Sequence, residues 1–447
     1  MRIFFDQIGC RLNYSEMETL AGQLRHAGHT IVAAPEQAQV VIFNSCAVTA
    51  GAERDSRKRL NALHRATPQA RIAVTGCWAT LRPQQAAALP GVALVADNRR
   101  KEMLFALLEP WSAELDDAAT LAHMQPDGTP FGALAATDAR TARTRAFVKV
   151  QDGCNNRCTF CIIPRLRGDL VSRPAADVLR EAERLVKAGV KELLVISQDT
   201  SAYGVDVKYE ASKWRDKEVR AKFLDLSREL GSLGAWVRLH YVYPYPHVDE
   251  IMPLMADGVV LPYLDIPMQH GSPSVLKRMK RPASHEKQLA RIQKWRSEVP
   301  NLALRSTFIV GFPGETEEEF DELLAFLDEA QLDRVGCFKF EPVRGAPAND
   351  LENAVPDEVK AQRYARFMET QQKISARRLK QKVGNREPVI IDRVENGMAV
   401  GRTRGDAPEI DGVVHIASRR PLKVGEIATV KIERADAYDL HGTVAGF

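Results

Sequence analysis

Short apolar runs alternate with amphipathic stretches through the first hundred residues. Strands are predicted at 2–5 (RIFF), 39–48 (QVVIFNSCAV) and 70–79 (ARIAVTGCWA). Between them, 15–28 predicts a helix capped by Ser15 with Glu18 three residues on, and the charged stretch 53–66 predicts a second helix. Alternation of this kind is typical of an open parallel α/β sheet.

The same rhythm continues over a longer span in the middle of the chain. Six strands are predicted at 147–151, 192–198, 237–243, 263–268, 304–312 and 334–340. Amphipathic helices are predicted between them, for example at 174–189, 287–299 and 317–330. Six βα units fall short of the eight of a closed barrel, so we expect a partial, open-sided (βα)6 barrel with its active site at the strand ends.

A long helix is predicted at 357–384, where Gly384 ends it, and the hydrophobic pattern of the C-terminal part then changes. Short strands with turn residues between them then predict a small β-barrel of the OB type. Residues 111–140 lose periodicity and are interpreted as a linker. The α/β chain is therefore expected to divide at 1–110, 111–140, 141–383 and 384–447.

Three of the seven cysteines form a C-x3-C-x2-C motif, at Cys154, Cys158 and Cys161. Thiols at this spacing in a tight loop can reach one metal cluster, and three thiolates on a cubane leave one iron without a protein ligand. Structural zinc usually takes four ligands, and no fourth Cys or His is nearby. The motif therefore indicates a cluster that binds S-adenosylmethionine at its open iron, rather than buried thiols or a zinc loop.

Three more cysteines each follow a predicted strand: Cys10, Cys46 and Cys77. Ligand sites of open α/β sheets lie at the carboxyl ends of the strands. The three thiols can thus converge on one edge of the N-terminal domain, which is an argument for a second cluster site.

Several other residues are candidates for cofactor binding. Phe160 lies between two motif cysteines, where packing and contact with the cluster or adenine are equally expected. Gln198 ends a predicted strand and can reach a cofactor. Arg305 and Ser306 are expected to point into one region, beside Gly311, whose lack of a side chain permits close approach of a ligand. A tight turn into a helix is an alternative explanation of that glycine.

Three features have ordinary structural explanations beside functional ones. Residues 239–247 are dense in aromatics, His and Pro, and they suit a substrate mouth or a packed loop. Cys337 is most simply a small core residue. The basic helix at 54–65 suits polyanion binding or a solvated face.

The composition is that of a globular protein, with 45% hydrophobic and 27% charged residues among 447. No run approaches the ~18 apolar residues of a membrane span, and no signal peptide is recognised at the start. We therefore expect a cytoplasmic protein without a membrane partner, in which clustered thiols bind metal more often than they form disulfides.

The chain resembles the radical-SAM methylthiotransferases. Their three parts are an N-terminal domain with three cluster cysteines, a C-x3-C-x2-C radical-SAM core and a C-terminal TRAM domain, and all three are matched here in order. The resemblance implies two 4Fe–4S clusters, one held by Cys10, Cys46 and Cys77 and the other by the motif cysteines. It also implies S-adenosylmethionine as the source of a 5′-deoxyadenosyl radical, and an electron donor such as flavodoxin or ferredoxin.

The substrate expectation depends on which branch of the family is matched. Long stretches such as 194–208, 238–258 and 332–350 resemble the branch that methylthiolates the β-carbon of an aspartate of protein twelve of the small ribosomal subunit. The first 160 residues, with IGCRLNYSE and FNSCAVTAG, look more like the branch that modifies threonylcarbamoyladenosine in tRNA.

The charge distribution bears on this choice. Residues 385–447 carry 9 Lys/Arg and 10 Asp/Glu, with an acidic cluster at 406–411, whereas residues 1–110 carry 13 and 9. A tRNA-binding TRAM domain should be basic, so the ribosomal protein is favoured and tRNA is the alternative. A non-catalytic iron–sulfur or zinc module that binds RNA is a third interpretation.

Overall fold

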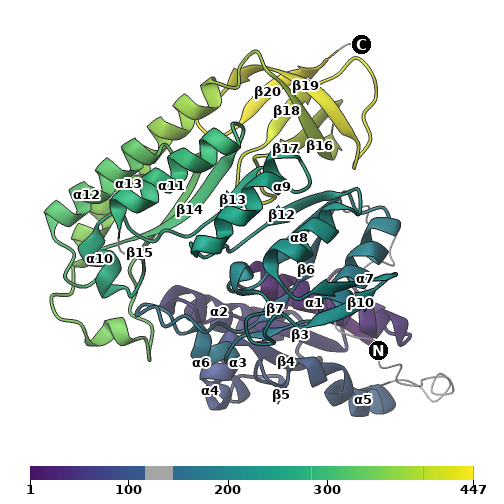
Figure 1. The fold of residues 1–447 in the computed structure, drawn as a ribbon. Helices are drawn as coiled ribbons and strands as arrows, with labels where there is room; N and C mark the ends of the chain where they lie inside the picture. Colours follow the sequence, from purple (N-terminus) through teal and green to yellow (C-terminus); the bar gives the residue numbers. More distant parts are fainter. Residues whose placement is uncertain (116–143, 283, 396, 446–447) are drawn as a thin grey trace.

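The N-terminal domain is a five-stranded parallel sheet covered by helices on both faces (Figure 1). The structure, a computed structural model, describes residues 1–115, 144–282, 284–395 and 397–445. The strands are β1 (Arg2–Gln7), β2 (Thr30–Ile31), β3 (Val40–Ser45), β4 (Arg71–Gly76) and β5 (Val92–Val95), in the order β2-β1-β3-β4-β5. The helices are α1 (Arg11–His26), α2 (Ala50–Ala66), α3 (Cys77–Leu81), α4 (Pro83–Ala87) and α5 (Leu104–Leu115). The first five residues of the predicted linker complete α5, and the rest of it lies outside the described residues.

Strand β3 explains why this sheet is covered on both sides. All six of its residues are buried. Val41 and Phe43 pack in one apolar cluster with α2, while Val40 and Ile42 pack in another with α1 and α5. A continuous apolar strand of this kind is expected where both faces of a parallel sheet are buried.

The middle of the chain forms a six-stranded parallel sheet in the order β15-β14-β13-β12-β9-β6. The strands are β6 (Arg145–Lys149), β9 (Glu192–Ile196), β12 (Trp236–Leu239), β13 (Tyr263–Asp265), β14 (Ala303–Val310) and β15 (Arg334–Lys339). The main covering helices are α7 (Ala175–Lys187), α8 (Phe223–Gly231), α9 (Met252–Ala256), α11 (His285–Glu298), α12 (Glu317–Ala330) and α13 (Asp357–Lys380). All six predicted strands are present, and because β6 and β15 do not pair with each other, the predicted open-sided barrel is confirmed.

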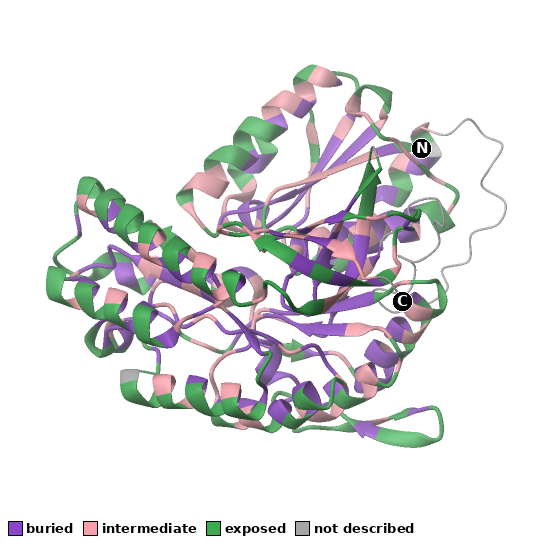
Figure 2. Cartoon of the chain, turned by 90° about the horizontal axis from the view of Figure 1, so that it is seen from above, coloured by how far each residue is buried: buried purple, intermediate pink, exposed green. Residues whose placement is uncertain are grey.

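Shorter elements lie between the strands of the core sheet along the chain. They are β7 (Gln151–Asp152), α6 (Ile163–Arg167), β8 (Val171–Ser172), α10 (Pro273–Arg278) and a hairpin of β10 (Ala211–Trp214) and β11 (Lys217–Arg220). Figure 2 shows the buried strands inside and the exposed faces of the helices outside. No helix of the described residues is long and apolar enough to cross a membrane.

The C-terminal part is a closed five-stranded barrel, as predicted. Its strands are β16 (Arg386–Glu395), β17 (Met398–Thr403), β18 (Val414–Ala417), β19 (Ile427–Ala435) and β20 (Leu440–Val444), in the order β16-β17-β18-β20-β19. Alternate residues of β19 (Ala428, Val430 and Ile432) fill its interior. Closure removes free sheet edges, which makes a small barrel self-contained.

The acidic cluster at 406–411 joins this barrel to the core instead of facing a partner. Asp406 is buried and accepts hydrogen bonds from Arg334 of β15. Asp411 accepts a hydrogen bond from the Tyr263 hydroxyl (2.7 Å) and lies 3.6 Å from Arg305. The third carboxylate, that of Glu409, pairs with Arg145 of β6. The interpretation of this cluster as a surface for a cationic partner is therefore wrong, because all three of its carboxylates have partners inside the chain.

Candidate functional site

The three motif cysteines lie in a loop that follows β7. Cys154 and Cys158 are buried and Cys161 is partly buried. The Cys154 amide donates to the carbonyl of Gly168 (3.2 Å), and the Cys161 amide donates to the carbonyl of Cys158 (3.1 Å). Between the cysteines, Thr159 donates its hydroxyl to the Arg278 carbonyl (2.9 Å). The loop is thus held by backbone bonds on both sides, which leaves the thiols free for another ligand.

The three N-terminal cysteines end adjacent strands of the first sheet, as predicted. Cys10 caps α1 after β1, Cys46 directly follows β3, and Cys77 begins α3 after β4. Because β1, β3 and β4 are neighbours in one parallel sheet, the three thiols share one edge. The Cys10 thiol also lies near the core, where its charge contributes to raising the pKa of Tyr241 to about 12, although burial is the larger cause.

Three of the six cysteines of the two groups directly follow a glycine with a positive φ: Cys10 and Cys77 at the sheet edge, and Cys154 in the loop. Gly9, Gly76 and Gly153 have φ values of 124°, 95° and 74°. A Cβ at Gly76 would lie 2.3 Å from the Ser45 carbonyl oxygen, and one at Gly153 would lie 2.0 Å from that of Asp169. Only glycine fits these positions without strain. The Gly-Cys pair, present at all three of these positions, is therefore a local signal in the sequence for these cysteines.

Burial keeps the Cys46 and Cys161 thiols protonated in the absence of a metal. It raises the pKa of Cys46 to about 11 and that of Cys161 to about 12, and neighbouring cysteines add to both shifts. Metal ligation requires thiolates, so metal binding at these sites must release protons. One cation is present to balance the charge, because Nη1 of the buried Arg281 lies 3.8 Å from Sγ of Cys158.

The three thiols of each group lie close enough to affect one another: Cys10 and Cys77 add to the raised pKa of Cys46, and Cys154 and Cys158 add to that of Cys161, although burial is the larger cause of both shifts. A cubane binds three thiolates through three different irons. The donor set of each group therefore fits an iron–sulfur cluster.

Glu16 of α1 connects the N-terminal domain to the cysteine loop of the core. Its carboxylate is fully buried and accepts hydrogen bonds from Lys101 (2.6 Å), Lys149 (3.2 Å) and Arg167 (2.7 Å). Burial alone would raise the pKa of Glu16, but the charges of Arg167, Lys101 and Lys149 outweigh it and hold that pKa well below its usual value. Arg167 also contacts Asp152, two residues before Cys154. A buried ion network therefore fixes one cysteine group relative to the other.

Phe160 is part of the cysteine loop, and Gln198 lies beside that loop. Gln198 follows β9 and donates to the Asp152 carboxylate (3.1 Å), while its own buried Oε1 has no hydrogen-bond partner among the described residues. Phe160 packs on an apolar cluster with Phe312 and Phe340. The unsatisfied oxygen of Gln198 leaves an acceptor for a bound ligand, whereas the contacts of Phe160 are those of packing.

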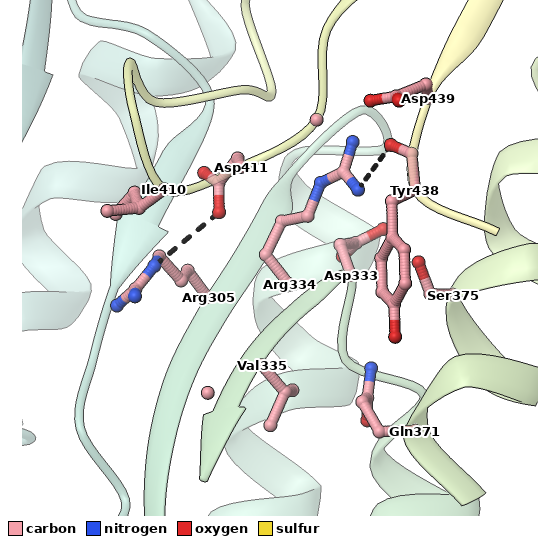
Figure 3. Close-up of a pocket in the computed structure, with 12 residues that line it drawn as sticks. Arg305, Asp333, Arg334, Val335, Gln371, Ser375, Ile410, Asp411, Tyr438 and Asp439 are labelled. Carbon is pink, nitrogen blue, oxygen red and sulfur yellow. Dashed lines mark hydrogen bonds and ion pairs between the residues drawn. The ribbon is translucent and has the colours of Figure 1, made fainter. Parts of the chain in front are cut away.

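The remaining candidates lie on β14 and its end, but they do not share one region. Arg305 and Ser306 are consecutive in the strand, so their side chains leave opposite faces of the sheet. Arg305 donates to Asp265 (2.9 Å) and lies beside Asp411 (Figure 3), while Ser306 accepts from the Met268 amide (3.0 Å). The expectation that both point into one region is therefore wrong.

Gly311 follows β14 with φ 72°, and its amide donates to both carboxylate oxygens of Glu315 (3.0 Å each). A Cβ there would lie 2.3 Å from Cγ of Lys360. The described contacts of this glycine are thus those of a tight turn.

The aromatic segment after β12 contacts the buried carboxylate of Asp199, the residue after Gln198. Asp199 accepts hydrogen bonds from Tyr245 (2.9 Å) and from Asn156 of the cysteine loop (2.8 Å). Burial raises the pKa of Asp199 in spite of these bonds. Tyr243 lies under the guanidinium of Arg281, 4.0 Å from its ring centre. The segment therefore forms a wall beside the motif cysteines, and Cys337 lies apart in the core.

Comparison with known proteins agrees with this arrangement. Residues 148–327 match the Radical SAM superfamily, residues 2–97 match an uncharacterized protein family, UPF0004, and residues 383–445 match the TRAM domain. The ribosomal protein uS12 methylthiotransferase RimO of Xanthobacter autotrophicus is 59% identical over 100% of this chain and 97% of its own length. That of Bradyrhizobium diazoefficiens is 56% identical over 100% and 99%.

Among solved structures, the radical S-adenosylmethionine methyltransferase TsrM from Kitasatospora setae, with cobalamin and a [4Fe-4S] cluster bound, has a similar fold. Its TM-score is 0.54 at 13% identity, and the match covers 89% of this chain and 80% of that one. At this identity the likeness concerns the fold alone.

Proposed function

Because the chain belongs to the family of ribosomal protein uS12 methylthiotransferases named RimO, we propose that it inserts a methylthio group at the β-carbon of an aspartate of that ribosomal protein. The chain is a radical-SAM enzyme, and its relatives extend over its full length. That full-length identity is the observation that carries the proposal. It favours the ribosomal protein over the tRNA alternative, even for the N-terminal residues that look like the tRNA branch.

The radical-SAM core binds a 4Fe–4S cluster and S-adenosylmethionine, which together supply the radical chemistry. We assign the ligands of that cluster to Cys154, Cys158 and Cys161. Arg281 balances the charge of the thiolates, and Asp199, Tyr243 and Tyr245 form a wall beside the loop. In the overall change, the β-carbon loses one hydrogen atom and gains an SCH3 group, a net addition of SCH2.

We further propose that Cys10, Cys46 and Cys77 hold a second 4Fe–4S cluster. The support is the arrangement of these thiols on one sheet edge and the ion network of Glu16, which fixes that edge against the core. Gln198 is the cofactor contact we favour, since its Oε1 is buried and unsatisfied. A small redox protein of the flavodoxin or ferredoxin class would supply electrons in the cytoplasm.

The test is anaerobic reconstitution followed by incubation with recombinant uS12 and, separately, with tRNA. About eight irons per chain are expected from two clusters, with 5′-deoxyadenosine formed and an SCH2 unit added to a uS12 peptide. The Cys158→Ala variant should lose 5′-deoxyadenosine formation, and Cys337→Ala should keep it. A labelled tRNA nucleoside with an unmodified uS12 peptide would overturn the proposed substrate.

A further inference from the structure

Strand β15 leaves one edge of the core sheet open. Among the described residues it pairs only with β14, so its other edge has no strand beside it. An edge strand presents unpaired backbone N–H and C=O groups, and an extended peptide can add to them as a further strand. Natural proteins usually protect such edges, so an open one calls for an explanation.

A cavity of about 250 Å³ runs along the first half of this edge (Figure 3). One wall is β15 itself, from Arg334 to Gly336. Two loops of the C-terminal barrel contribute Ile410 and Tyr438, and helix α13 contributes Gln371 and Ser375. Arg334 of β15 donates a hydrogen bond to the Tyr438 carbonyl (2.9 Å), which joins the strand to the barrel loop. The edge is therefore flanked by a formed slot and not by bulk solvent alone.

Two residues of β15 leave room for a ligand beside the strand. A Cβ added at Gly336 would have no neighbour closer than Oγ1 of Thr307, at 4.0 Å. Two residues on, Phe338 is 60% exposed. An exposed aromatic next to an open strand edge is an anchor that an extended chain can cover.

The far end of the same edge leads to both cysteine groups. Phe340, just past β15, packs edge to face against Phe312 in the cluster that includes Phe160 of the cysteine loop. The next residue, Glu341, accepts a hydrogen bond from the Gly51 amide at the start of α2 (3.2 Å), five residues after Cys46. A peptide that follows β15 is thus led to the space between the two groups.

We propose that the open edge of β15 binds an extended segment of the protein substrate, the segment of uS12 that carries the modified aspartate. This inference rests on the proposed function and adds where the substrate docks. The charge of the substrate agrees with this docking site, because a ribosomal protein must neutralise RNA phosphates and is cationic. The Asp439 carboxylate lines the slot with a side chain 39% exposed.

The test is the Gly336→Val variant, because valine suits a strand and its side chain would fill the slot without meeting the protein. Binding is measured by fluorescence anisotropy of a labelled uS12 peptide centred on the aspartate, and KM by mass spectrometry of modified uS12. The Kd and KM should rise at least tenfold. Phe338→Ala should raise them several-fold. Iron content and melting temperature should match the wild type, and Ala211→Val, on the exposed strand β10, is the matched control.

Three outcomes contradict the proposal. If wild type modifies uS12 and Gly336→Val does so with unchanged Kd and KM, the docking site is overturned and the proposed function stands. If wild type neither binds nor modifies uS12, the function fails and the docking site with it. If Gly336→Val only converts a dimer to a monomer in sedimentation, the edge is an interface between copies.

Discussion

The guanidinium of Arg11 lies 3.1 Å from Nε2 of His240, although 229 positions separate the two residues in the chain. Burial, then the charge of Arg11, lowers the pKa of His240 to about 3, so the ring is neutral. The Nδ1 of His240 lies 2.8 Å from Nη1 of Arg11 and 3.0 Å from the Asp265 carboxylate, so the ring is held between a cation and an anion. Arg11 also donates to the Pro408 carbonyl (3.1 Å), so one side chain joins the N-terminal domain, the core and the C-terminal barrel.

Arg11 directly follows Cys10, so its replacement should change how the first cysteine group faces the core. We expect Arg11→Ala to lower the yield of methylthiolated uS12 at least tenfold while 5′-deoxyadenosine is still formed. The reason is that the core keeps its own cysteines but loses a fixed partner domain. The measurement is the ratio of the two products in one anaerobic assay. Arg25→Ala, at the exposed end of α1, is the control, and an unchanged ratio in Arg11→Ala would refute the coupling.

Replacing Glu16 should destabilise the fold in a pH-dependent way. Glu16→Gln leaves Lys101 and Arg167 buried without their carboxylate, at a cost of about 3–5 kcal/mol in the free energy of unfolding. Because the pKa of Glu16 is held well below its unfolded value of about 4.3, this stabilisation is complete above that pH and is lost as the pH falls through the folded pKa.

The pKa of Asp152 is also held below its unfolded value, so this carboxylate adds to the same pH dependence. Burial is outweighed by Lys149 and Arg167, which lower its pKa to about 2. The free energies of unfolding of the wild type and of Glu16→Gln are measured with urea from pH 7 to pH 2. Their difference should be constant above about pH 4.5 and shrink below it. Glu102→Gln, on an exposed residue, should show no difference, and a gap between wild type and Glu16→Gln that grows on acidification would contradict the assignment.

The six core strands and the place of each cysteine could be predicted from the sequence, because apolar periodicity and strand ends are local properties. The contact of Arg11 with His240 could not, since it joins residues 229 positions apart and depends on how separate domains pack. The same holds for Asp406, whose charge suggested a surface and whose partner is Arg334. The opposite directions of the Arg305 and Ser306 side chains could have been predicted, because consecutive residues of a strand face opposite sides of the sheet.

The glycines that precede cysteines should separate the two cysteine groups experimentally. Gly76→Ala forces a Cβ against Ser45 at a left-handed φ, a strain of about 1–3 kcal/mol that displaces Cys77. We expect iron to fall from about eight to about four per chain while 5′-deoxyadenosine formation persists. Gly153→Ala, which displaces Cys154, should lose a similar amount of iron and also that activity.

The control for both is Gly28→Ala. Gly28 has φ 86° but no atom within 4 Å of an added Cβ, so the substitution strains the backbone without a clash. Its iron content should equal that of the wild type. Iron near eight in all three variants would show that these glycines do not position the cysteines.

The charge of Arg281 should set the reduction potential of the core cluster. Its Nη1 is 3.8 Å from Sγ of Cys158 and the side chain is buried, so the cation acts where screening by water is weak. Removing it in Arg281→Gln favours the less negative, oxidised cluster and should move the midpoint potential to a more negative value. Arg281→Lys, which keeps the charge, should move it less. An anaerobic titration followed by electron paramagnetic resonance, in a Cys77→Ala background that leaves one cluster, gives the potential. Equal midpoints for wild type and Arg281→Gln would show that the cation has no part in reduction.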